Sequence, residues 1–123
     1  MHKVSVDVQK NRLYITLGQL ERVDEILTLG KTLRKECKKL HTGFTCITDL
    51  REYELLEENY EIYIKGIQEF LRDMGVSKVV RVVRRFGRWG HVQFDKTSMN
   101  LGYSAQSVDS MGKAEAILDG TDE

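Results

Sequence analysis

The stretch FTCITDLR, residues 44–51, decides the fold. Its first five residues show no clean alternation of apolar and polar side chains, and β-branched residues are frequent among them. This pattern is typical of a strand in the interior of a sheet that is covered on both faces. We therefore predict a strand over 44–48, which Asp49, Leu50 and Arg51 bring to an end.

A helical pattern precedes this strand. Apolar residues recur at helical spacing from residue 20 to residue 40, and Gly43 supplies the stop. The predicted buried stripe comprises Leu20, Val23, Leu27, Gly30, Leu33, Cys37 and Leu40. Acidic residues lie at the start of this helix and basic residues at its end, which complements the macrodipole. We interpret the lysines as a solvated face.

A second helical pattern follows the strand, over residues 54–74, and Gly75 is a strong stop signal. Its apolar positions are Leu56, Tyr60, Tyr63, Ile67, either Phe70 or Leu71, and Met74. Acidic residues are frequent between 52 and 61, where the dipole of a helix start favours them. We give little weight to acid–base catalysis by these carboxylates.

Further strands lie on both sides of these units. Residues 3–8 and 13–17 alternate and predict an antiparallel hairpin around 9–11, whereas the valine-rich stretch 78–83 predicts another strand. Near the end we predict a short helix over 89–99 and an edge strand over 102–105. The final prediction is a terminal helix, capped by Ser110 or Asp109, with Val108, Met111, Ala114, Ile117 and Leu118 on one face.

The predicted order is β-β-α-β-α-β-(α)-β-α. Strand–helix–strand units impose parallel pairing, and the hairpin makes the sheet mixed. The fold class is therefore α/β, a mixed and mostly parallel sheet with helices packed on it. We expect a single domain over residues 1–119 and a frayed tail over 120–123.

Composition narrows the classes of function. The 123 residues have a formal net charge of zero, so no global charge draws the protein to nucleic acid or to an anionic membrane. The two cysteines form no metal-binding or disulfide pattern, and we interpret both as small buried hydrophobic residues. No export signal or membrane span is recognisable. We expect a cytoplasmic protein that does not bind membranes.

Three local patterns resemble the STAS, or anti-sigma-factor-antagonist-like, family. YITLGQL at 14–20 resembles the strand of the family that ends in Gly-x-Leu before the first helix. ITDLR at 47–51 resembles its central strand ending in an Asp-Leu step. The helix 54–74, with Gly75 and the valine-rich strand, resembles the unit that follows. The likeness covers residues 4–85 and implies a STAS-like fold.

The resemblance also implies a regulatory or protein-interaction module without catalytic activity. Classical antagonists of the family are phosphorylated on a Ser or Thr just after the central strand. The matching stretch 50–54 reads LREYE and contains neither residue, while Thr48 lies within the strand. We therefore expect a module that lacks the classical phosphorylation switch.

Candidate binding residues fall in two places. Arg51 would lie at a helix start, where its charge opposes the dipole, a mild misfit that a binding residue would show. We prefer the simpler interpretation of a solvated loop arginine. Between residues 78 and 91, five basic residues interleave with aromatic ones and no acidic residue occurs. Arginines next to aromatic residues can bind phosphates, stack on bases or form interface hot spots. The alternative is that the apolar residues pack in the core and the arginines form ion pairs with the acidic stretch. The candidate partner- or ligand-binding residues are Asp49, Arg51, Arg81, Arg84, Arg85, Arg88 and Trp89.

We expect no enzyme, because the sequence contains no nucleophile–base set, metal-ligand pattern or phosphate loop. We likewise expect no cofactor, no catalytic residue and no metal. The leading hypothesis is a protein partner of unknown identity, with a homodimer as one form of it. The alternative is a small anionic ligand, a nucleotide or acidic lipid, bound at the carboxyl ends of the strands. Nucleic-acid binding through 78–91 ranks below both.

Overall fold

Five strands form one sheet in the computed structural model, which describes residues 2–20, 23–52, 54–55, 60–83 and 104–120. Their order across the sheet is β1-β2-β4-β6-β7. The strands are β1 (Lys3–Asp7), β2 (Arg12–Thr16), β4 (Thr45–Asp49), β6 (Lys78–Val82) and β7 (Ser104–Val108). β1 is antiparallel to β2, and every other neighbouring pair is parallel. The prediction of an α/β fold with a mixed, mostly parallel sheet is confirmed.

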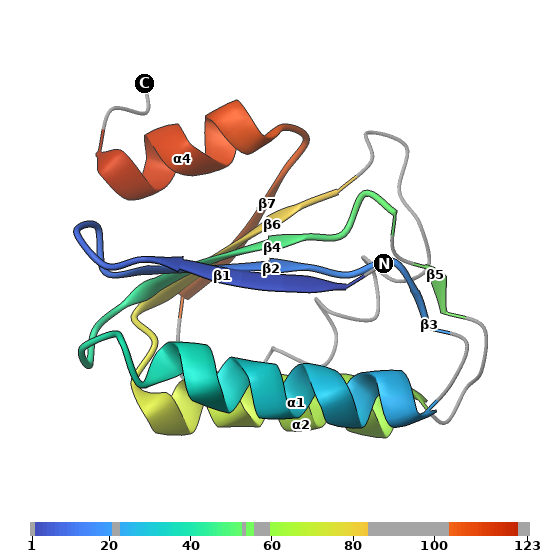
Figure 1. The fold of residues 1–123 in the computed structure, drawn as a ribbon. Coiled ribbons are helices and arrows are strands. Elements are labelled where there is room, and N and C mark those ends of the chain that lie inside the picture. Colours follow the sequence, from blue (N-terminus) through green and yellow to red (C-terminus); the bar gives the residue numbers. More distant parts are fainter. Residues whose placement is uncertain (1, 21–22, 53, 56–59, 84–103, 121–123) are drawn as a thin grey trace.

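Helices cover both faces of this sheet (Figure 1). On one face lie α1 (Val23–Cys37) and α2 (Tyr60–Met74), and on the other lies α4 (Met111–Asp119). β4 is the central strand, and three of its five side chains are buried. Coverage on both faces explains why its sequence lacks alternation.

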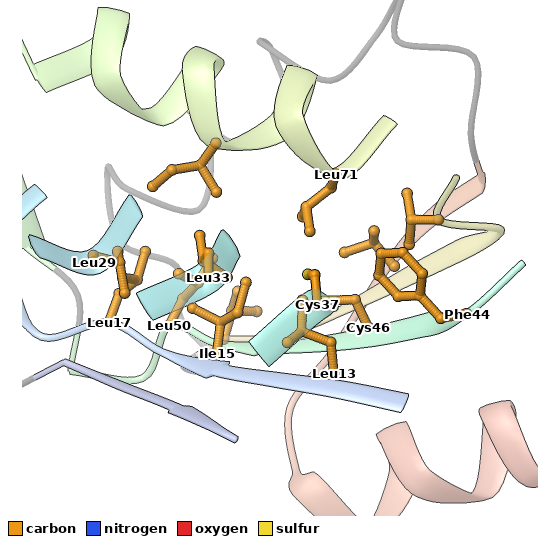
Figure 2. Close-up of a cluster of buried hydrophobic side chains, with 14 residues drawn as sticks. Leu13, Ile15, Leu17, Leu29, Leu33, Cys37, Phe44, Cys46, Leu50 and Leu71 are labelled. Carbon is orange, nitrogen blue, oxygen red and sulfur yellow. The ribbon is translucent and has the colours of Figure 1, made fainter. Parts of the chain in front are cut away.

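The larger hydrophobic core lies between the sheet and the α1–α2 layer (Figure 2). β2 contributes Leu13 and Ile15, β4 contributes Cys46, and α2 contributes Leu71. A smaller cluster lies under α4 and consists of Ile47, Val80, Val82 and Ala114. Because side chains alternate along a strand, β4 and β6 supply both clusters from adjacent residues.

The buried face of α1 differs from the predicted one. Leu29, Leu33 and Cys37 are buried at steps of four, whereas Leu27 is 58% exposed. The prediction that Leu27 belongs to the buried stripe is wrong. Packing against the sheet selects the Leu29–Cys37 stripe, and Leu27 faces outward beside it. The helix also ends at Cys37, six residues before the predicted stop at Gly43.

The second helix begins later than the sequence predicts. Residues Glu54–Leu55 form a short strand, β5, and α2 starts at Tyr60. β5 pairs in parallel with β3 (Gln19–Leu20), whose second residue, Leu20, belongs to the predicted helical stripe. β2 and β4 pair in the main sheet, and the segments that follow them pair with each other again as β3 and β5. This long-range pairing overrides the local helical pattern.

The C-terminal elements follow the prediction with one shift. β7 lies at the sheet edge, beside β6, and includes Val108, which the pattern assigned to the following helix. Ser110 is the N-cap of α4 and its side chain accepts a hydrogen bond from the Lys113 amide. Gly120 ends the helix in the left-handed conformation. The predicted helix over 89–99 lies outside the described residues.

Two glycines with positive φ join the α2–β6 turn to the loop before β4. The Gly43 amide donates to the Gly75 carbonyl at 2.7 Å, and their φ angles are 90° and 93°. A Cβ atom at Gly75 would lie 2.7 Å from Cγ2 of Thr42, while one at Gly43 would meet nothing within 4 Å. Glycine is therefore favoured at position 75 for two reasons: the positive φ of the turn and the close approach of the Thr42 side chain.

The β1–β2 turn is braced by Asn11, the one described non-glycine residue with a positive φ, at 52°. Its Nδ2 donates to the His41 carbonyl at 3.1 Å, and its Oδ1 accepts from the His41 amide at 2.8 Å. The Asn11 carbonyl accepts from the Thr45 amide at 3.1 Å. These three bonds fix the loop that leads into the central strand.

Candidate functional site

The four parallel strands end at the same edge of the sheet. Asp49 closes β4 and lies in register between Thr16 of β2 and Val82 of β6. Beyond it, the Leu17 amide donates to the Asp49 carbonyl at 3.0 Å, and the Leu50 amide donates to the Val82 carbonyl at 2.8 Å. The chain therefore leaves β4 from a fixed position at the edge where open α/β sheets bind ligands.

Asp49 holds Arg51 in one orientation at this edge. Oδ1 of Asp49 accepts from Nε of Arg51 at 2.9 Å, and Oδ2 accepts from Nη2 at 2.8 Å. Oδ1 also accepts from the Arg51 backbone amide at 3.1 Å. The contact is bidentate, which is the most directional form of a carboxylate–guanidinium pair. We call these two residues the Asp49–Arg51 pair.

The two members of the pair differ in their exposure. The Asp49 side chain is 14% exposed, whereas the Arg51 side chain is 45% exposed. The Arg51 guanidinium stabilises the ionised carboxylate and lowers the pKa of Asp49 below its ordinary value, although partial burial opposes the shift. The pair therefore presents an arginine to solvent on a carboxylate that stays ionised at neutral pH.

Arg51 does not lie at a helix start, contrary to the sequence interpretation. It occupies a turn directly after β4, and β5 follows before α2 begins at Tyr60. The conflict with the helix dipole therefore does not exist. The feature that distinguishes Arg51 is its bidentate contact with the residue two positions earlier.

Arg81 lies away from the Asp49–Arg51 pair. It is 2% exposed and is in register with Thr48, so its side chain lies on the face opposite to that of Asp49. It lines a small internal cavity of about 10 Å³ together with Thr48 and Gln68, which are also buried. The structure thus places Arg81 inside the layer between the sheet and α2.

The basic segment 78–91 does not form one surface over its described part. Lys78 begins β6 and lies near the amino edge of the sheet, whereas Arg81 is buried within the strand. Four of the predicted site residues lie outside the described residues: Arg84, Arg85, Arg88 and Trp89. Their contribution stays a prediction.

A charged cluster under α4 has no counterpart in the sequence interpretation. Arg12 is 3% exposed and donates to Asp119 Oδ1 at 2.8 Å, to Glu115 Oε1, and to Thr45 Oγ1 at 3.3 Å. The Tyr14 hydroxyl lies 3.0 Å from both carboxylate oxygens of Glu115. The available signal was the spacing of Glu115 and Asp119, which puts two acids on one face of α4. Their common partner in β2 makes this cluster a structural anchor.

Both cysteines are buried thiols, as the sequence predicts. Burial raises the pKa of Cys37 to about 11 and that of Cys46 to about 12. The Cys46 sulfur lies 3.7 Å from Oγ1 of Thr48, which partly offsets the effect of burial. Protonated, buried thiols are poor nucleophiles.

Within the described part of the chain, no three His, Cys, Asp or Glu side chains converge in a way that could hold a metal ion. No helix among the same residues combines the length and the apolar character that a bilayer span needs. No family model matches this sequence, and no curated protein matches it.

Proposed function

We propose that this chain is a non-enzymatic, STAS-like interaction module that binds a protein partner at the carboxyl edge of its sheet. One observation carries the proposal: the Asp49–Arg51 pair presents an exposed arginine in a fixed orientation. Arginine is enriched among interface hot spots. Asp49 orients the side chain before binding, so less conformational entropy is lost when a partner engages it.

The edge itself supports the same proposal. Backbone hydrogen bonds fix the chain where it enters the turn that carries Arg51: the Leu17 amide donates to the Asp49 carbonyl, and the Leu50 amide donates to the Val82 carbonyl. A site built on fixed strand ends keeps its geometry better than one on a long loop. The turn contains no Ser or Thr between residues 49 and 53, so regulation of this surface would not use the classical phosphorylation switch.

Affinity capture with quantitative mass spectrometry tests the proposal. Arg51→Ala should lose the partners that the wild type retains. Arg72→Ala is the matched control, because Arg72 also pairs with an aspartate and its side chain is also 45% exposed. Asp49→Asn should weaken capture to an intermediate degree, since it keeps the arginine and loosens its orientation. Identical partner sets for Arg51→Ala and the wild type would refute the proposal.

The predicted arginines beyond β6 need a separate variant. Reversing the charge of Arg84, Arg85 and Arg88 together should remove the same partners if these residues extend the Arg51 surface. Partners that depend on Arg51 alone would confine the interface to the described edge. Sedimentation of the purified protein shows whether the partner is a second copy of the chain.

A small anionic ligand is the second candidate for this edge. An exposed, oriented guanidinium at the carboxyl ends of parallel strands suits a carboxylate or a phosphate. A ligand that binds the native state raises the melting temperature. A shift with nucleotides or acidic lipids that disappears in Arg51→Ala would favour this candidate over a protein partner.

A further inference from the structure

A groove runs between the two helices on the outer side of the α1–α2 layer, and its volume is about 360 Å³. Apolar and glycine residues line it: Leu27, Gly30 and Leu33 from α1, and Gly66, Ile67 and Phe70 from α2. We call it the α1–α2 groove. Figure 1 shows the two helices together on one face of the sheet. Neither Asp49 nor Arg51 lines this groove.

Two helix-interior glycines open this groove. Gly30 lies in the middle of α1, and Gly66 lies in α2. A Cβ atom built at either residue meets no atom within 4 Å, so the fold itself does not need glycine there. Each glycine makes its helix less stable than alanine would. Bare backbone at two sites that line one groove leaves room for another chain to approach closely.

The floor of the groove is apolar, and one of its walls is exposed. Leu33 is 1% exposed and Ile67 is 8% exposed, whereas Leu27 is 58% exposed. Leu27 is one of two described large hydrophobic residues with high exposure, and the other, Val8, lies in the β1–β2 turn. An exposed leucine beside an apolar floor suits an apolar binding partner.

The charges on the groove specify the partner further. Lys31 and Arg34 line it, are exposed and lie three residues apart on α1, so they neighbour one another on the helix surface. Neither makes an ion pair with a residue that the structure describes. A binding partner therefore needs an apolar stripe for the floor and carboxylates for one rim.

We propose that the α1–α2 groove binds an acidic amphipathic helix of a partner protein. From residue 27 to residue 34 the groove extends about 10 Å along α1, which is about two turns of a helix. Two turns present apolar anchors at i, i+4 and i+7, and acidic residues three or four apart can face Lys31 and Arg34. The inference is independent of the Asp49–Arg51 pair and adds a second contact surface.

Fluorescence anisotropy with two designed helical peptides tests the proposal. The acidic peptide carries leucines at i, i+4 and i+7 with glutamates along one flank, and the control peptide has lysines in place of the glutamates. The wild type should bind the acidic peptide at least about tenfold more tightly, a difference of about 1.4 kcal/mol. Arg34→Glu should abolish that preference. Lys35→Glu is the matched control, because Lys35 is exposed on the same helix but does not line the groove.

Gly66→Leu separates loss of binding from loss of folding. The leucine side chain enters open space, and leucine is a better helix former than glycine, so the melting temperature should not fall. Affinity for the acidic peptide should fall by about tenfold or more, because the side chain fills the groove. Gly30→Leu should act in the same way. Arg51→Ala should leave peptide binding unchanged, which keeps this test distinct from that of the proposed function.

Several results would overturn the proposal. The first is equal affinity for both peptides, or for wild type and a stably folded Gly66→Leu variant. The second is binding of dodecanoate, lost in Gly66→Leu, without binding of the acidic peptide, which would identify a carboxylate amphiphile as the occupant. The third is a wild-type dimer that Gly66→Leu dissociates, which would identify a second copy of the chain.

Discussion

At the scale of single residues, the ion pair between Asp49 and Arg51 makes the stability of the fold depend on pH. The pKa of Asp49 is lower in the folded protein than the value of about 3.9 for an unperturbed aspartate. The stabilisation by the pair is therefore fully present above about pH 4 and is lost as the pH falls through the lower, folded pKa. In an NMR titration of side-chain carboxyls, Arg51→Ala should raise the pKa of Asp49. Arg72→Ala should leave it in place, and an unchanged value in Arg51→Ala would contradict the pairing.

The two glycines with positive φ predict unequal costs for the same substitution. Gly43→Ala should cost about 1–2 kcal/mol of unfolding free energy, because a Cβ disfavours that backbone conformation. Gly75→Ala should cost more, because its Cβ would also lie 2.7 Å from Cγ2 of Thr42. Chemical denaturation measures both. Adding Thr42→Ser, which removes Cγ2, should recover part of the loss in Gly75→Ala and none in Gly43→Ala.

The burial of both thiols predicts slow alkylation of the native protein. With pKa values of about 11 and 12, Cys37 and Cys46 are almost entirely protonated at pH 8. Iodoacetamide should therefore label them only as fast as the protein opens, and denaturant should increase the rate sharply. Rapid labelling of the native protein, followed by mass spectrometry, would show that one thiol is accessible.

At the scale of elements, Arg12 fastens α4 to the sheet. Its guanidinium contacts two acidic side chains of α4, Glu115 and Asp119, each about one third exposed. Arg12→Met should lower the free energy of unfolding by about 2 kcal/mol, because hydrogen bonds between charged groups are lost from a buried position. Lys113→Ala, which removes an exposed ion pair with Asp109, should change it by less than about 0.5 kcal/mol. If Arg12→Met and Lys113→Ala changed the free energy of unfolding equally in chemical denaturation, Arg12 would not anchor α4.

The elements also show what the sequence could predict. Strands β1, β2, β4 and β6 and the Gly75 stop were predictable because each depends on local pattern and backbone chemistry. The start of α2 was not, because the pairing of β3 with β5 joins residues 35 positions apart, Gln19 with Glu54 and Leu20 with Leu55. The exposure of Leu27 likewise depends on which stripe of α1 the sheet selects.

The candidate site was predictable only in part for the same reason. Asp49 and Arg51 are only two residues apart, but the sequence singled out Arg51 for a helix start that does not exist, and their bidentate contact was not predicted. The burial of Arg81 depends on Thr48 and Gln68, which come from a different strand and from a helix. The role of Arg12 depends on acids more than 100 residues away. The periodicity of the sequence gives no information about such long-range contacts.

At the scale of the whole molecule, the two faces of the sheet hold cores of unequal size. The cluster on the α1–α2 face is much larger than the one under α4, which has four fully buried members. We expect α4 amides to exchange hydrogen through a local opening of lower free energy than the amides of β4 and β6. Native-state hydrogen exchange measures this difference. Arg12→Met should speed exchange in α4 more than in β4, and uniform acceleration would instead indicate one cooperative unit.

The brace at Asn11 has a consequence for the ageing of the protein in storage. The His41 amide can only donate and its carbonyl can only accept, so both ends of the Asn11 side chain have fixed chemical roles. Deamidation would replace the donating NH₂ with a carboxylate oxygen that faces the His41 carbonyl oxygen. A change of one mass unit would thereby turn an attraction into a repulsion at the entrance to the central strand. We therefore expect aged protein that peptide mapping shows to be deamidated at Asn11 to unfold at a lower denaturant concentration than fresh protein.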